Sequence, residues 1–290
     1  MSNGIKSRQN EDKSIAMLAA QRKLYNEVGW LDAFNFALLV VLPILFALLQ
    51  ELGTPWSWIR FLSYSLSIAM LYISSFSAKA SRKKKEAAAS IQLAFDIYVF
   101  KMPWDRRLFG EQKNLNATIA EKSKKLLNDE KQKKMLLDWY TPTVDEMDLQ
   151  KGIWACLREN YHWDAGLRKR YKVFAILLIA VIVAIIFITG LGNNEPIQEW
   201  IMRFVFVLPL GNWLSKLLSG LNDDLDRLKE LDREFSSTGK RDMDDLQEME
   251  KKIIDHRKTA VKIPNLIYYR FRDNDEDREH RIVTMDSEPV

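Results

Sequence analysis

Residues 173–194 form an uncharged run that constrains the fold more than any other feature of the chain. All 22 residues lack charge, and nearly all of them are apolar. A water-soluble helix of this length needs a polar face, and this run has none. About 20 helical residues, each rising about 1.5 Å, cover the ~30 Å of hydrocarbon in a bilayer. The run therefore predicts a membrane-spanning helix, although a mean hydropathy of −0.22 and 28% charged residues are typical of a soluble protein.

Three further segments are expected to span the membrane: residues 33–50, 61–78 and 197–218. The first carries Pro43 near its centre, which predicts a kink. The second contains six serines, a composition that suits close helix contact or a wet lumen. The last is the least regular, because Glu199 and Arg203 lie in its first two turns and Pro209 is expected to interrupt it. It is plausible as a span only when the other helices shield it.

The distribution of Lys and Arg predicts the direction of these segments. The short connectors at residues 53–56 and 193–196 contain neither residue, whereas basic clusters such as RKKK at 82–85 follow the other ends. Basic residues stay on the cytoplasmic side of a membrane. Both termini are therefore expected inside, and the chain divides into five parts: a cytosolic N-terminal segment (1–30), transmembrane hairpin 1 (31–78), a cytosolic helical loop domain (79–170), transmembrane hairpin 2 (171–220) and a cytosolic helical tail (221–290).

The cytosolic parts are expected to be helical throughout. Helices are predicted over residues 79–100, 115–140, 147–171, 221–235 and, after a break at 236–240, up to 259. No strand alternation is convincing. The predicted fold class is an all-α membrane protein, with four transmembrane helices in two hairpins and a cytosolic helical domain.

The two larger cytosolic parts differ in charge. Residues 79–170 hold 20 Lys and Arg against 13 Asp and Glu, whereas residues 221–290 hold 14 against 19. The basic part either faces the anionic inner leaflet or forms a pocket for a phosphate-bearing ligand, and the two roles are compatible.

Residues that carry enzyme or metal chemistry are not apparent. Cys156 is the single cysteine, and the three histidines share no ligand spacing. No nucleophile lies beside a plausible base, and no glycine-rich phosphate loop is present. We therefore expect no catalytic residue, no metal site, no cofactor and no enzymatic activity.

Aromatic and charged residues cluster at three places in the predicted cytosolic helices, around residues 95–105, 138–142 and 156–171. One interpretation is structural: they are caps, i,i+4 pairs and aromatic anchors. The other is that arginines and aromatic planes clamp the phosphates and bases of a nucleotide. The candidate ligand-binding residues are Asp96, Trp104, Arg158, Asn160, Trp163, Asp164 and Arg168.

Five ordered segments together resemble the SMODS-associating four-transmembrane effector family over nearly the whole chain. They are QRKLY at 21–25, IQLAFDIYVFKMPWD at 91–105, DWYTP at 138–142, CLRENYHWDAGLRKRY at 156–171 and KIPNLIYYRFR at 262–272. Two departures affect contacts of the replaced side chains. The family pattern has Gln-Arg after the cysteine, where Leu157 and Arg158 follow Cys156. It has Glu after the first Gln of the Phe-Asp motif, where Leu93 follows Gln92.

The resemblance implies a membrane effector of a bacterial anti-phage system of the CBASS type. Such an effector responds to a cyclic oligonucleotide made by a neighbouring synthase, acts without DNA or RNA, and disrupts the inner membrane as an oligomer or pore. The serines of residues 61–78 favour self-association, with Ser67 and Ser74 one heptad apart on a helix-facing or lumen-facing stripe. The candidate membrane-interface or oligomer residues are Ser67, Ser74 and Arg203. The alternative is a constitutive small ion channel or transporter subunit, for which Arg203 beside Glu199 is the one indication.

Overall fold

The computed structural model describes residues 2–42, 44–45, 57–192, 196–236 and 242–287, and over these ranges it contains helices and turns but no strand. The all-α prediction is confirmed to that extent. The elements are α1 Ile5–Gln9, α2 Asp12–Phe36, the π-helix η1 Ala37–Val41, α4 Ser57–Phe100, α5 Arg106–Phe109, α6 Asn116–Leu127, α7 Glu130–Lys134, the 3₁₀ helix η2 Pro142–Glu146, α8 Leu149–Gly192, α9 Ile197–Ser236, α10 Met243–Thr259 and α11 Asn265–Ser287.

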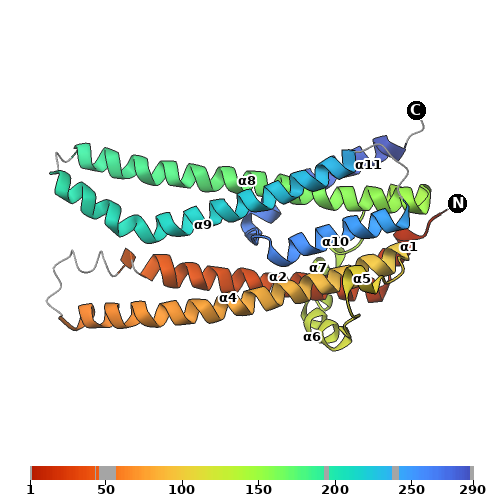
Figure 1. Ribbon diagram of the computed structural model, residues 1–290, viewed down its shortest axis with the longest axis horizontal. Coiled ribbons are helices and arrows are strands. Elements are labelled where there is room, and N and C mark those ends of the chain that lie inside the picture. Colours follow the sequence, from red (N-terminus) through yellow and green to blue (C-terminus); the bar gives the residue numbers. More distant parts are fainter. Residues whose placement is uncertain (1, 43, 46–56, 193–195, 237–241, 288–290) are drawn as a thin grey trace.

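Two long antiparallel helix pairs set the shape of the molecule (Figure 1). One pair is α2 with α4, and the other is α8 with α9. The shorter α10 lies between the pairs and packs against both α4 and α8, while α11 packs against α8. Both chain ends lie at the right of Figure 1, at the opposite end of the molecule from the α8–α9 turn.

Three helices extend much further than a single membrane crossing requires. α4 and α8 have 44 residues each and α9 has 40. The predicted boundaries at 78, 170 and 220 therefore all fall inside continuous helices. The expectation that Pro209 interrupts its segment is wrong, because α9 continues through it. A proline removes one backbone donor, which a long packed helix can tolerate, and α9 changes direction along its length (Figure 1).

The shorter helices agree less well with the ranges predicted from the sequence. The helix predicted over residues 115–140 is divided into α6 and α7, because the Asp129 side chain accepts hydrogen bonds from the backbone amides of Lys131 and Gln132 and caps a new helix. α11 was not predicted at all. The helices predicted around residues 79–100 and 243–259 are confirmed. Pro43 lies outside the described residues.

The main hydrophobic core occupies the half of the molecule that contains both chain ends. Phe95, Phe100 and Tyr140 are fully buried there, and the Tyr140 ring centroid lies 6.1 Å from that of Phe95 and 5.3 Å from that of Phe100. Aromatic contacts of this kind add about 0.5–1.5 kcal/mol beyond area burial. They fix the segment around Tyr140 against α4.

The other half of the molecule exposes apolar side chains. On α8 they include Val173, Leu177 and Ile188, the last with 70% of its surface exposed. Others lie near the end of α2 and on α4, such as Trp30, Phe34 and Phe76. Over the described residues, none of the helices combines the length and apolar character that crossing a bilayer demands.

Candidate nucleotide-binding site

A cavity of about 470 Å³ lies where α2, α4 and α8 meet the connection between α10 and α11. Residues 134–140, at the end of α7 and before η2, line another side. Small-molecule pockets in proteins range from about 300 to 1,000 Å³. The cavity is thus large enough for a ligand with several functional groups.

Segments that are far apart in the sequence converge on this cavity. Each of the five segments quoted for the family resemblance supplies lining residues. They are Gln21, Arg22 and Tyr25; Gln92; Asp138, Trp139 and Tyr140; Glu159, Asn160, Trp163, Asp164, Leu167 and Arg168; and Lys262, Ile263, Asn265, Tyr268 and Tyr269.

Positive charge predominates along the cavity wall. The cations are Arg22, Lys85, Lys134, Arg168, Arg257 and Lys262, and the carboxylates are Asp138, Glu159 and Asp164. One guanidinium nitrogen, Nη1, of Arg22 and of Arg257 is buried without a hydrogen-bond partner. Buried donors in folded proteins are almost always satisfied, so these two nitrogens have unused hydrogen-bonding capacity, although the charge of Arg257 is compensated in part by Asp96 and Glu250.

Aromatic rings line the same cavity. The Trp163 ring centroid lies 6.1 Å from that of Tyr268, which in turn meets Tyr269 edge-on at 5.2 Å. Trp139 follows Asp138, whose φ of 49° is unusual for a residue other than glycine. Two hydrogen bonds with the Asn10 side chain hold Asp138 in place. Base planes stack on such rings.

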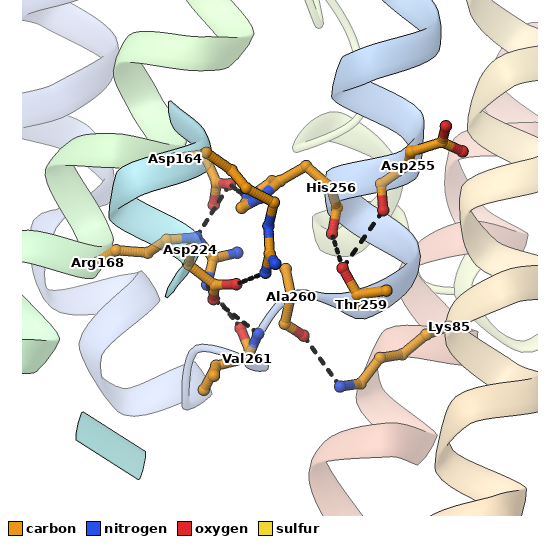
Figure 2. Close-up of polar contacts among 10 residues, drawn as sticks. Lys85, Asp164, Arg168, Asp224, Asp255, His256, Thr259, Ala260 and Val261 are labelled. Atoms are coloured by element: carbon orange, nitrogen blue, oxygen red, sulfur yellow. Dashed lines mark hydrogen bonds and ion pairs between the residues drawn. The ribbon is translucent and has the colours of Figure 1, made fainter. Parts of the chain in front are cut away.

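Arg168 joins three elements at one edge of the cavity (Figure 2). Its Nη1 donates to Asp224 Oδ2 on α9 at 2.6 Å and to the carbonyl of Val261 at 2.8 Å, and its Nε donates to Asp164 Oδ2 at 3.1 Å. Arg168 and Asp224 are both almost completely buried. The cation therefore links α8, α9 and the α10–α11 connection at once.

Asp164 lies between Arg168 and His256. Its Oδ2 is 2.8 Å from His256 Nε2 on α10. Burial alone would raise the pKa of Asp164, but the charge of Arg168 and the hydrogen bond with His256 hold this pKa below its usual range. Asp164 is therefore an anion at neutral pH, and it fixes α10 against α8.

The two lysines beside this network are incompletely solvated. Burial lowers the pKa of Lys262 to about 8, against the attraction of nearby carboxylates, and also lowers the pKa of Lys85. Lowered lysine pKa values mean that the protein compensates their charge only in part. A bound anion would supply the missing compensation.

A buried polar group lies beneath the cavity. The Tyr140 hydroxyl donates to Asp96 Oδ1 and accepts from the Asn160 side-chain amide at 2.9 Å. Burial raises the pKa of Glu250 well above its usual range and also raises that of its neighbour Asp96. A proton is therefore retained within this pair of carboxyl groups, which supports the cavity from below.

The comparisons with known proteins agree with the motifs that line the cavity. Residues 3–284 match the family model described as SMODS-associating 4TM effector domain. The chain belongs to that family. A Bacillus cereus (strain VD146) protein named probable CBASS effector molecule is 28% identical over 240 residues, or 80% of this chain and 76% of the relative. Both descriptions indicate a CBASS effector with a role in antiviral defence. No solved structure matches.

The structure brings together some of the predicted ligand-binding residues and separates others. Asn160, Trp163, Asp164 and Arg168 line the cavity, and the predicted Asp164–Arg168 pair is confirmed. Asp96 lies beneath them.

Trp104 and Arg158 lie elsewhere. The Trp104 Nε1 donates to the carbonyl of Gly110, and its ring packs on Phe109. Arg158 stacks over Trp154, 4.5 Å from the ring centroid. Ser74 lies on α4, while the side chains of Ser67 and Arg203 fall outside the described residues.

Several cavity residues were not predicted. Arg22, Lys262 and Tyr268 lie in segments quoted for the family, so their membership was the available signal. Lys85 and Arg257 lie in long charged stretches where nothing local distinguishes them. Within the described ranges, no group of His, Cys, Asp and Glu is arranged to hold a metal ion.

Proposed function

We propose that this 4TM effector is a membrane protein gated by a cyclic oligonucleotide that binds in the cavity described above. The observation that carries the proposal is the convergence of all five family segments on one cationic, aromatic cavity. Cations would bind the phosphodiester groups, and rings such as Trp163 would stack on the bases. Asn160, Asp164 and Arg168 are the further ligand-binding residues of this proposal.

The membrane part of the proposal has separate support. The uncharged run at residues 173–194, the apolar side chains exposed on α8 and the family description all favour a multi-pass protein of the bacterial inner membrane. Hairpins at residues 31–78 and 171–220 would span it, and both termini, with residues 79–170 and 221–290, would be cytoplasmic. A topology reporter fused after Ser236 should report cytoplasm, and one placed between Gly192 and Pro196 should report the outside.

Activation would act through the assembly state. A ligand shifts a conformational equilibrium only by binding one state more tightly than the other. We propose that the bound state self-associates through the serine stripe of α4, which includes Ser67 and Ser74, and makes the membrane leaky as an oligomer or pore. Replacing both serines with leucine should reduce leakage while leaving insertion unchanged.

The experiment is dye release from liposomes that contain the full-length protein, with a panel of cyclic di- and trinucleotides. Release is expected with one of them. Arg22→Gln should raise the nucleotide concentration that is needed, because it removes an unsatisfied cavity donor, whereas the adjacent Lys23→Gln lies outside the cavity lining and should not. Release without nucleotide would favour a constitutive channel, and no release with any nucleotide would overturn the proposal.

A further inference from the structure

Residues 260–263, which we name the strap, connect α10 to α11 along the cavity wall. Three cavity cations donate hydrogen bonds to strap carbonyls. Lys85 Nζ lies 2.9 Å from the oxygen of Ala260, Arg168 Nη1 lies 2.8 Å from that of Val261, and Lys262 Nζ lies 2.7 Å from that of Ile263. Figure 2 shows the first two of these bonds.

Carbonyl oxygens are weaker partners for these cations than anionic oxygens would be. A carbonyl oxygen is neutral, whereas a phosphate oxygen carries negative charge, which adds Coulomb attraction to the same hydrogen bond. Burial lowers the pKa of Lys262 to about 8 and also lowers the pKa of Lys85, and the carboxylates near them only partly offset this effect. An anion with several oxygens is therefore able to compete with the strap carbonyls for Lys85 and Arg168, whereas Lys262 belongs to the strap itself.

The strap is also tied to α9. The Val261 amide donates to Asp224 Oδ2 at 2.8 Å, the same oxygen that accepts from Arg168. Close packing accompanies this bond: a Cβ added at Gly220 of α9 would lie 2.8 Å from Val261 Cγ2. The strap thus fits against α9 because position 220 has no side chain.

We propose that Lys85 and Arg168 form a subsite for the phosphate groups of a polyanionic ligand, and that the carbonyl groups of Ala260 and Val261 in the strap occupy this subsite in the ligand-free protein. Phosphate oxygens replace the strap carbonyls, the strap withdraws, and its bond to Asp224 on α9 is broken. The inference rests on the proposed function in taking the ligand to be an oligonucleotide, and it adds which cations bind the phosphates and what they release.

The test uses the full-length protein in detergent, with inorganic pyrophosphate as the simplest probe and cyclic di-AMP beside it. Gly220→Ala should unseat the strap without changing any charge. Gly211→Ala is the matched control, because it lies on the same helix and an added Cβ there meets nothing within 4 Å. Both gain similar helix propensity. Hydrogen exchange of the amides at 261–263 and the pyrophosphate affinity are measured.

We expect pyrophosphate to accelerate exchange of the Val261 amide in the wild-type protein about ten-fold or more, since its charge-assisted hydrogen bond to Asp224 is lost. Gly220→Ala should accelerate it without pyrophosphate and should bind pyrophosphate roughly three- to ten-fold more tightly, because less of the protein holds the closed strap. Gly211→Ala should resemble the wild type in both measurements.

Slower exchange with pyrophosphate would overturn the inference, because the strap would then help to build the site. Unchanged or weaker binding by Gly220→Ala, or no pyrophosphate binding at all, would do the same. If pyrophosphate displaces the strap but no cyclic nucleotide binds, the inference about the strap holds and the proposed function is wrong. If cyclic di-AMP binds and causes dye release while exchange at 261–263 stays constant, the proposed function holds and the inference about the strap is wrong.

Discussion

The two ends of the molecule use the same helices in opposite ways. Around the cavity, α8 buries charges and pairs them, as Arg168 does with Asp164 and Asp224. Toward its other end, the same helix exposes large apolar side chains such as Val173 and Ile188. One end is held by specific long-range partners, and the other offers an apolar surface with no charge to satisfy. The difference means that substitutions at the two ends should fail in different measurements.

The largest effect is expected when Arg168 is removed. Arg168→Ala leaves Asp224, which is 1% exposed, without its guanidinium partner, and losing one partner of a buried pair costs about 3–5 kcal/mol. The free energy of unfolding in detergent should fall by that amount. Arg82→Ala, which removes an exposed i,i+4 partner of Glu86, should change it by less than about 1 kcal/mol. Equal losses of unfolding free energy in the two variants would show that the buried contacts of Arg168 do not stabilise the fold more than an exposed ion pair does.

The next effect concerns the apolar end. Val181→Arg places a charge on a side chain that is 54% exposed on α8 near the middle of the uncharged run, and a charge at the centre of a membrane helix costs about 2.5–3.5 kcal/mol of insertion free energy. Carbonate-resistant membrane association should therefore drop markedly. Leu266→Arg introduces the same charge at an exposed position on α11, outside the proposed spans, and should have no effect on association. Normal association of Val181→Arg would argue that this surface does not face lipid.

The apolar end of the molecule could be predicted from the sequence, but the charge network around the cavity could not. The apolar run of α8 is contiguous, so its character is visible in any window of the chain. The cavity network is not, because Arg168 and Asp224 are 56 residues apart and Asp164 and His256 are 92 apart. No local pattern encodes such pairs. The i,i+4 pair of Asp164 and Arg168 was predictable because helical spacing alone brings it together.

A similar limit explains why some candidate ligand-binding residues lie outside the cavity and some cavity residues were not predicted. Trp104 and Trp163 both stand beside aspartates in the sequence, yet Trp104 packs on Phe109 and Trp163 lines the cavity. Composition does not separate the two, whereas their places in the fold do, because Trp104 lies in the segment between α4 and α5 and Trp163 lies inside α8. Arg257 was missed for the converse reason, since the charged residues around it in α10 conceal the one that faces inward.

The two tryptophans give the third prediction. Trp163→Ala should weaken binding of the cognate cyclic nucleotide by about 1–3 kcal/mol, or roughly 5- to 150-fold, because a base loses its stacking surface. Trp104→Ala, the matched truncation outside the cavity, should leave the dissociation constant within about two-fold of the wild-type value. Isothermal titration with the purified protein measures both. Equal weakening would return Trp104 to the list of ligand contacts.

The smallest expected effect is on the pH dependence of binding. Lys262 has a pKa of about 8, so it is mostly cationic at pH 7 and mostly neutral at pH 9. An anionic ligand prefers the cation, and affinity should therefore fall with rising pH, by up to about ten-fold between these values. Lys85, whose pKa burial also lowers, acts in the same direction. Lys262→Gln should bind more weakly at pH 7 and show a flatter profile, whereas an unchanged slope would remove Lys262 from the phosphate contacts.

The continuity of α8 has a mechanical consequence. From Arg168 to Gly192 the helix runs 24 residues without a break, a lever arm of about 36 Å at 1.5 Å per residue. If α8 tilts by about 5° at Arg168, beside the cavity, Gly192 moves by roughly 3 Å, by the same geometry. If the hydrogen bonds around Arg168 break, a small tilt of α8 there thus becomes a larger displacement at Gly192. The stiffness of the helix determines how much of this displacement reaches its far end.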